Sequence, residues 1–354
     1  VDMVCLADVS KWFWSDWFWL PAGITFGELK DQPGIQIARA SDLYLMPILA
    51  IGILCLRYMF DICMSKVAQN MGIVDQRKRP EPNEVMETMY KICKRPSAED
   101  TTALSKRLDW SNKKILTWFR LRRNLDRPSL VCKFKESSWR TLFYISAFVY
   151  GLYTLIPSPW FWDTVQCWVD YPKQNLWTTV YYYYMLEGGF YISLLFSIMS
   201  DVKRKDFPEQ LIHHAATILL IMFSYVANFV RIGTMVMVIH DISDIFLEIS
   251  KTLFYAGKQK IADVGFVVFS VVFIITRILI YPYYILHTTL VKVYWVLEPF
   301  PGYYLFNALL VILQLLHVFW AVIIVKMAIR MIRVGTVEKD ARSDVEESDE
   351  DEQE

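Results

Sequence analysis

The sequence has few of the features that mark a disulfide-rich or a metal-binding module. Its 354 residues contain six cysteines without a CxxC pair or a repeated spacing, which argues against a disulfide scaffold and against a zinc module. It also has no excess of one charge, because 37 basic residues balance 37 acidic ones. A zero net charge argues against a protein whose whole surface binds nucleic acid. The first 20 residues lack the clean apolar centre of a signal peptide.

Long apolar runs, in contrast, are abundant. Hydrophobic residues make up 55% of the chain, which is high for a soluble protein. Seven runs approach or reach the length of about 20 residues that a helix needs to cross a bilayer. They lie at 43–64, 139–157, 177–199, 211–228, 232–249, 262–284 and 303–329. We therefore expect an all-α polytopic membrane protein with about seven transmembrane helices.

The distribution of Lys and Arg between these runs predicts the orientation of the chain. The loop between the first two runs, 65–138, contains 17 basic and 9 acidic residues. From there on, loops that are poor and rich in basic residues alternate, and the basic ones face the cytosol. This predicts a lumenal N-terminal segment at 1–42 and a cytosolic C-terminus. The tail at 331–354 is acidic, and we expect it to be disordered, with Ser343 and Ser348 suited to an acidophilic kinase.

The first loop carries signals for a small helical domain at 80–129. Residues that favour helix N-caps precede three apolar-periodic stretches. These residues are Asn83, Ser97 and Ser111. The third stretch contains WFRLRRN at 118–124, which resembles the recognition helix of a homeodomain.

One position of that motif departs from the homeodomain pattern. In homeodomains the residue two positions after the Phe is the Asn that contacts adenine. Here it is Leu121, which cannot form that bidentate hydrogen bond. The domain is also tied to the membrane at both ends. We therefore expect no sequence-specific DNA binding, but a basic module that contacts anionic lipid, CoA or a partner protein.

Five ionisable residues within two of the apolar runs form the main candidate site. They are His213 and His214 in the fourth run and His240, Asp241 and Asp244 in the fifth. Ionisable residues inside a membrane are costly, so they indicate a functional site unless they pair structurally. His213 would lie about 6 Å and Asp244 roughly 12 Å from the cytosolic surface, so the two groups can meet. The alternative is that these residues form a structural polar cluster that holds the helices together. Since no helix carries His at i and i+4, we expect no metal site.

The segment that contains these residues, 201–251, resembles the signature motif of the ceramide synthases within the TLC domain. The similarity extends to WFWLP at 17–21, to RRNLDRPS at the end of the cytosolic loop and to RSDVEESD in the tail. The loop and the tail look closest to the vertebrate very-long-chain branch. Many members carry a glycosylation sequon just after WLP, whereas this chain has no N-x-S/T sequence.

The resemblance implies an enzyme of the endoplasmic reticulum membrane, with 43–64 as its first membrane helix and 130–330 as its TLC catalytic domain. Members of this family transfer a fatty acyl group from acyl-CoA to the amine of sphinganine or sphingosine. Acyl-CoA is then a co-substrate, no cofactor is bound, and membrane lipid is a further partner. The protein could form a homodimer or a heterodimer. The alternative functions are a non-catalytic TLC-type lipid sensor and a membrane-tethered homeodomain regulator.

The resemblance also implies roles for the candidate residues. His213 would accept the acyl group as an acyl-imidazole. Proton transfer would fall to His214 and Asp244, and Asp241 and His240 would orient them. Imidazole titrates near neutrality, so a histidine suits a nucleophile or a general base. In the alternative mechanism no covalent intermediate forms, and a histidine deprotonates the amine, which attacks the thioester directly.

Three further groups belong to this prediction. Lys203, Arg204 and Lys205, at the cytosolic end of the fourth run, suit the phosphates of CoA or act as ordinary positive-inside flanking residues. Glu187 and the tyrosines at 181–184 either border the site or, for the tyrosines, form an interfacial belt. In the family, the loop that corresponds to 290–302 influences the preference for acyl-chain length.

Overall fold

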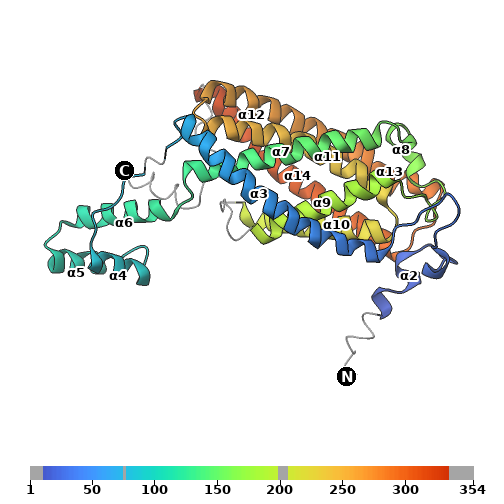
Figure 1. Ribbon diagram of the computed structural model, residues 1–354, viewed down its shortest axis with the longest axis horizontal. Coiled ribbons are helices and arrows are strands. Elements are labelled where there is room, and N and C mark those ends of the chain that lie inside the picture. Colours follow the sequence, from blue (N-terminus) through green and yellow to red (C-terminus); the bar gives the residue numbers. More distant parts are fainter. Residues whose placement is uncertain (1–10, 75–76, 198–205, 335–354) are drawn as a thin grey trace.

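The computed structural model describes residues 11–74, 77–197 and 206–334, and this part of the chain is almost entirely helical (Figure 1). Its long helices lie side by side in one elongated bundle. They are α3 (Leu45–Asn70), α7 (Leu130–Leu155), α9 (Thr178–Ser197), α10 (Phe207–Val226), α11 (Val230–Tyr255), α12 (Gln259–Phe273) and α14 (Pro301–Val334). In these ranges, β-pairing is limited to an isolated bridge between Gln32 and Ile35. The all-α class is confirmed.

Each predicted apolar run overlaps one of these long helices or its continuation, and the run at 177–199 ends outside the described residues. Several helices extend past their run at one end, because a helix continues through charged residues that end an apolar run. For example, α7 begins at Leu130, so it includes Lys133 and Lys135 before the run at 139–157. Likewise α3 continues to Asn70 rather than ending near residue 64.

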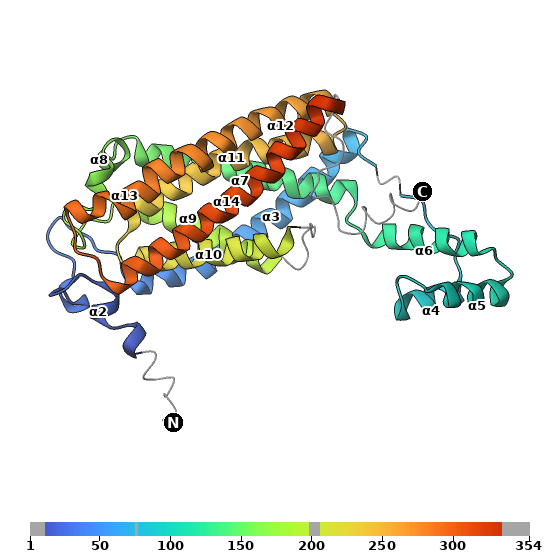
Figure 2. The same cartoon turned by 180° about the vertical axis from the view of Figure 1, so that it is seen from behind.

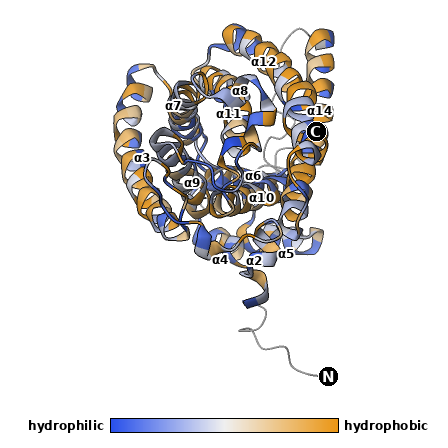
Figure 3. Cartoon of the chain, turned by 90° about the vertical axis from the view of Figure 1, so that its right-hand side faces the viewer, coloured by the Kyte–Doolittle hydropathy of each residue, from blue (hydrophilic) through white to orange (hydrophobic). Residues whose placement is uncertain are grey.

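Three helical segments of the described chain are long and apolar enough to cross a membrane. They are Ala40–Asn70, Gln259–Trp295 and Pro301–Arg333. Their outward faces carry apolar side chains, which appear as orange ribbon around the outside of the bundle (Figure 3). Such faces fit lipid and not water. The chain is therefore a multi-pass membrane protein.

Helix α11 lies at the centre of the bundle, where it packs most extensively against α7 and α12 and also contacts α9 and α10. Helix α9 packs against α3, and small residues allow the close approach. A Cβ atom on Gly188 would lie 2.4 Å from Sδ of Met46, so a larger residue there would require the Met46 side chain to move. Central α11 is thus shielded on several sides, and it carries three of the five candidate residues.

The segment after α12 is not an ordinary helix. From Ile274 to Leu286 the chain forms a π-helix, η4, which contains Pro282. Proline has no N–H to donate, and π-helical turns are rare and occur mostly at functional sites. The π-helix leads to α13 (His287–Leu290) and η5 (Lys292–Trp295) and then to α14. The sequence predicted a plain transmembrane helix here, because the apolar run at 262–284 does not reveal the wider turn.

Three short helices lie apart from the bundle, beyond the end where α3 finishes and α7 begins (Figures 1 and 2). They are α4 (Glu84–Ile92), α5 (Ala98–Leu108) and α6 (Asn112–Asp126). The predicted N-caps are confirmed, because Asn83, Ser97 and Ser111 each accept a hydrogen bond from a backbone N–H of the first helical turn. We call these helices the α4–α6 module. Its core consists of Met86, Tyr90, Leu104, Ile115, Trp118 and Phe119.

The N-terminal described residues cover the opposite end of the bundle. Trp19 of α2 (Asp16–Trp19) is fully buried, and its ring packs against Phe223 of α10 and Phe306 of α14 at 5.0 and 6.0 Å between centroids. The remaining short elements are η1 (Phe26–Glu28), η2 (Ala40–Tyr44), α8 (Pro159–Trp162) and η3 (Thr164–Cys167). The five cysteines within the described ranges are free thiols.

Candidate active site

The structure brings the five predicted site residues together between α10 and α11. The ring of His213 lies 5.7 Å from that of His214 and 6.3 Å from that of His240, centroid to centroid. Two adjacent cavities meet at this point, and Tyr191 of α9 lines both. The first cavity is lined mainly by apolar residues, and the second is lined by many polar ones.

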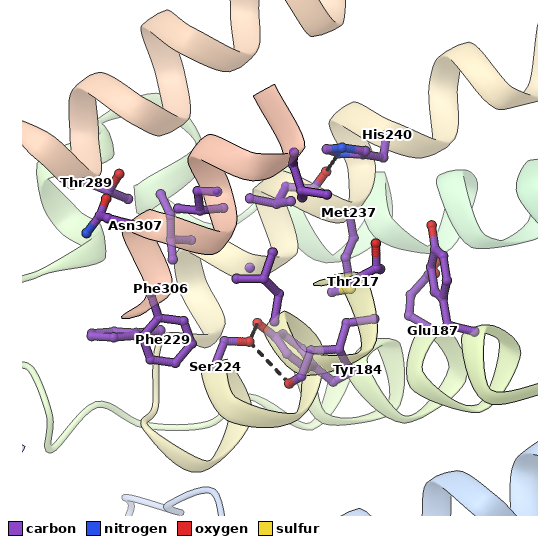
Figure 4. A pocket seen from close by; sticks show the side chains of 18 of the residues that line it. Tyr184, Glu187, Thr217, Ser224, Phe229, Met237, His240, Thr289, Phe306 and Asn307 are labelled. Carbon is purple, nitrogen blue, oxygen red and sulfur yellow. Dashed lines mark hydrogen bonds between the residues drawn. The ribbon is translucent and has the colours of Figure 1, made fainter. Parts of the chain in front are cut away.

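The apolar cavity has an empty volume of about 730 Å³ and runs between α9, α10, α11 and α14. One end is polar and contains Glu187, His240 and Asp241. The other end is aromatic, and Figure 4 shows Phe229 and Phe306 there, far from His240 and Glu187. Their rings meet edge to face at 4.7 Å. The cavity therefore offers an apolar channel with chemically reactive groups at one end only.

The polar cavity also has an empty volume of about 730 Å³. Its wall carries His213, His214 and Asp244 together with the basic side chains of Arg140, Lys251 and Arg277. The ring of Trp320 from α14 packs edge-on against His213 at 5.4 Å. Each of these basic groups is paired with an acid, Arg140 with Glu136, Lys251 with Glu248 and Arg277 with Asp244, so the wall is strongly polar beside the two histidines. The predicted CoA-binding residues Lys203, Arg204 and Lys205 lie outside the described residues.

A buried arginine fixes the C-terminal part of the site on α11. Arg277 of η4 is 3% exposed, and its Nη2 atom donates to the carbonyl oxygen of His240 at 2.8 Å, to Oγ of Ser243 at 2.9 Å and to Oδ2 of Asp244 at 3.1 Å. The ion pair with Asp244 removes the cost of burying either charge alone. Sequence analysis did not assign a role to Arg277. The sequence could have indicated its importance, because Arg277 is a lone arginine inside an apolar run.

A fourth histidine joins the cluster from a distant part of the sequence. His317 of α14 is fully buried, and its Nε2 atom lies 3.0 Å from Nε2 of His240. Nδ1 of His240 faces the carbonyl oxygen of Val236 at 2.7 Å. Since a carbonyl only accepts, Nδ1 of His240 carries the proton, and Nε2 of the ring faces Nε2 of His317. Both nitrogens of His240 are therefore engaged.

His213 differs from His240 in this respect. In the described chain, no side chain or backbone group forms a hydrogen bond with its ring, and its Nδ1 atom is buried without a partner. A histidine that is held only by packing keeps both nitrogens available for chemistry. Of these two histidines, His213 is thus the one that can act as a nucleophile without first breaking a contact.

Asp241 lies at the polar end of the apolar cavity, facing α9. The hydroxyl of Tyr183 donates to its Oδ2 atom at 3.1 Å. The carboxyl group of Glu187 faces that of Asp241. Glu187 is fully buried, and it lines the apolar cavity. The prediction that α9 borders the site is thus supported by contacts of Tyr183 and Glu187 with α11.

Comparison with known proteins agrees with this arrangement. The TLC domain model matches residues 133–326, and a homeodomain model matches residues 76–127. Human ceramide synthase 5 is 44% identical over 345 residues, which cover 96% of this chain and 88% of that protein. Human ceramide synthase 4 is 43% identical over 347 residues (97% and 88%), and human ceramide synthase 3 is 40% identical over 340 residues (96% and 88%).

The chain is a membrane protein in which a TLC domain covers more than half of the length. The chain belongs to the ceramide synthase family. It is an acyltransferase, as the signature motif predicted, and not a non-catalytic lipid sensor. Ceramide synthase 4, to which the loop and the tail pointed, matches at almost the same identity as ceramide synthase 5.

Proposed function

We propose that the chain transfers a fatty acyl group from acyl-CoA to the amine of sphinganine or sphingosine, and that His213 carries the acyl group between them. Family membership supports the overall reaction. One observation supports the role of His213: among the described residues its Nδ1 atom is buried without a hydrogen-bond partner, whereas both nitrogens of His240 are engaged. The histidine lines the polar cavity, which shares Tyr191 with the apolar one.

Each chemical step can then be assigned to a side chain. A ring nitrogen of His213 attacks the thioester carbonyl, the carbon–sulfur bond breaks, and the imidazole proton leaves to give free CoA thiol. The amine of the sphingoid base then attacks the acyl-imidazole, an amide bond forms, and the proton of the amine returns to His213. His214 and Asp244 pass these protons, since both line the same cavity as His213.

The two cavities suit the two parts of acyl-CoA. The polar cavity, with Arg140, Lys251 and Arg277 in its wall, faces the charged CoA portion. The apolar cavity accepts the acyl chain. Along α11, Phe229 and Asp241 are twelve residues apart, which is about 18 Å at 1.5 Å per residue. The hydrocarbon core of a bilayer is about 30 Å thick, and one leaflet is half of that. The cavity is therefore about as long as one leaflet, and a long acyl chain fits in it.

We also propose that all seven long helices cross the membrane of the endoplasmic reticulum, with the N-terminal segment lumenal and the α4–α6 module cytosolic. The alternation of basic loops supports this orientation. Within the module, Leu121 replaces the adenine-binding Asn, so the module would bind anionic lipid, CoA or a partner rather than a DNA sequence.

Intact-protein mass spectrometry tests the role of His213. The purified protein, incubated with acyl-CoA alone, should gain the mass of one acyl group, and proteolytic fragments should place it on His213. The His213→Ala variant should gain none and should lose N-acylation of sphinganine by at least about a thousandfold, as for other nucleophiles. Asp244→Ala should also reduce the N-acylation.

A matched control is His287→Ala, because His287 lines neither cavity and its ring stacks on Tyr283 at 6.0 Å. This variant should keep the acyl adduct. If the parent protein makes ceramide but never shows an adduct, the direct attack of the amine on the thioester is correct instead.

A further inference from the structure

Glu187 is a buried acid that the proposed reaction does not use. Its side chain is fully buried in α9, and no group of the described chain donates a hydrogen bond to either of its carboxyl oxygens. Buried polar groups in folded proteins almost always have a hydrogen-bond partner. A carboxyl group that is left without a donor therefore needs an explanation.

The nearest ionisable group is a second acid. Asp241, 1% exposed, faces Glu187, and its Oδ2 atom accepts a hydrogen bond from the hydroxyl of Tyr183 at 3.1 Å. Two buried carboxylates repel each other unless they share a proton or a cation binds to them. The nearby guanidinium of Arg277 is engaged by His240, Ser243 and Asp244. We call Glu187 and Asp241 the carboxyl pair.

The position of the carboxyl pair indicates what kind of cation would bind. Both acids line the polar end of the apolar cavity, whose remaining wall is largely aliphatic and aromatic. Figure 4 shows Glu187 near the same end as His240, well away from Phe229 and Phe306. A small inorganic cation gains nothing from such a wall. The amine of a lipid substrate matches the acids, and at this end of the cavity it lies next to the carbonyl end of the acyl chain that occupies the apolar part.

We propose that the carboxyl pair binds the amino group of the sphingoid base and holds it beside the acyl group on His213. This inference rests on the proposed function, because it assigns the amine-binding groups of that reaction. The base arrives as an ammonium ion, and one carboxylate of the pair takes one of its protons. The neutral amine then forms the amide bond as described above, and the carboxyl group later releases that proton to solvent.

Steady-state kinetics of the full-length protein test this assignment with Glu187→Gln, which keeps the shape of the side chain and removes its charge. The KM for sphinganine should rise about tenfold to a hundredfold, which is the effect expected for the loss of one charge-assisted hydrogen bond. Formation of the acyl adduct from acyl-CoA alone should change less than about twofold. Glu187→Asp, which retains the charge, should recover part of the loss.

A matched control is Asp263→Asn, which makes the same kind of change at another buried acid. Asp263 lies on α12, accepts a hydrogen bond from Gln259 at 2.7 Å and lines neither cavity. Its KM for sphinganine should equal that of the parent. An unchanged KM in Glu187→Gln, or a loss of the adduct together with the rise in KM, would overturn the proposal.

A second measurement needs no variant and therefore does not depend on folding. Hexadecylamine and hexadecanol differ in head-group charge but not in chain length. The parent protein should be inhibited at least about tenfold more strongly by the amine, in competition with sphinganine, and Glu187→Gln should lose this difference. Equal inhibition of the parent by both compounds rejects the carboxyl pair as an amine site. A missing acyl adduct in the parent would instead reject the proposed role of His213.

Discussion

The chemistry that each histidine can perform depends on what holds its ring. Both ring nitrogens of His240 are engaged, one by the carbonyl oxygen of Val236 and the other by His317. The ring of His213 has no such contacts among the described residues. A histidine whose two ring nitrogens are hydrogen-bonded can position other side chains, whereas one whose nitrogens have no such contacts can react. We therefore regard His317 as a positioning residue that acts through His240.

Replacement of His317 tests this interpretation. His317→Phe removes the donor to Nε2 of His240 but keeps a ring of similar size. The loss of one buried hydrogen bond costs about 1–3 kcal/mol, so kcat should fall about fivefold to a hundredfold while the KM for acyl-CoA stays nearly constant. Steady-state kinetics with saturating sphinganine measure both constants.

His317→Gln should recover most of the lost kcat, because the amide of Gln can donate to His240. If His317→Gln is as impaired as His317→Phe, or if kcat does not change in either variant, His317 has only a packing role.

At the scale of the helices, the π-helix η4 has the largest effect on the site. It places Arg277 against the carbonyl of His240 and the carboxylate of Asp244 on α11. Pro282 lies within this segment, and the chain after it continues to α14, which supplies His317 and Trp320. A single irregular element thus positions Arg277 beside a histidine that comes from the next long helix.

The α4–α6 module contains its own charged cluster, away from the membrane helices. Asp126 at the end of α6 accepts hydrogen bonds from the hydroxyl of Tyr90 at 2.8 Å and from Nη1 of Arg122 at 2.6 Å, and it pairs with Lys94. Partial burial alone would raise the pKa of Asp126, but the hydrogen bonds from Tyr90, Arg122 and Lys94 outweigh it and hold the pKa below its ordinary value.

The sign of this shift predicts how the module responds to acid. Because the pKa of Asp126 is lower in the folded state, its contribution to stability is present above the unfolded value of about 3.9 and is lost as the pH falls through the folded value. At neutral pH, Asp126→Asn should destabilise the module by about 1 kcal/mol, since these contacts are partly exposed. Hydrogen exchange of amides in α4 and α6 should speed up about fivefold.

The pH dependence distinguishes this effect from a general loss of packing. The difference between the parent and Asp126→Asn should shrink as the pH falls below the unfolded value of about 3.9 and should disappear below the pKa of Asp126 in the folded state. Asp109→Asn serves as the control in the same module, because Asp109 has a φ of 54°, a conformation that Asn adopts readily. A difference that persists in acid contradicts the electrostatic explanation.

At the scale of the whole molecule, the question is which end of the bundle faces the lumen. The α4–α6 module and the residues around Trp19 lie at opposite ends (Figure 1). The chain contains no N-x-S/T sequence, so an introduced sequon reports on its own position alone. Such a sequon is glycosylated only in the lumen.

Two single substitutions decide the orientation. Gly23→Asn creates a sequon with Thr25 at a position whose φ of 84° Asn tolerates better than other side chains, and it should be glycosylated. Ala103→Asn creates one with Ser105 on the exposed face of α5 and should stay unmodified. Gel mobility before and after endoglycosidase treatment measures both. Glycosylation at residue 103 would place the module in the lumen and contradict the proposed topology.

Features that depend on neighbours in sequence could be predicted. The N-caps Asn83, Ser97 and Ser111 and the positions of the long helices follow from local hydrogen bonding and from apolar runs. The motif around His213 and Asp244 also indicated the family without any structure, because its residues are close together in the chain.

The contacts between distant residues could not be predicted in this way. His240 and His317 are separated by 77 positions, and Glu187 meets Asp241 only because α9 packs beside α11. Apolar runs show that helices form but not which faces meet, and they cannot reveal the π-helical turn that aims Arg277 at α11. The sequence by itself determined the helices and the reactive residue types. Packing of the helices decided which histidine is free to react and which acids lie in the cavity, because the contacts of His240 with His317 and of Glu187 with Asp241 each join two different elements.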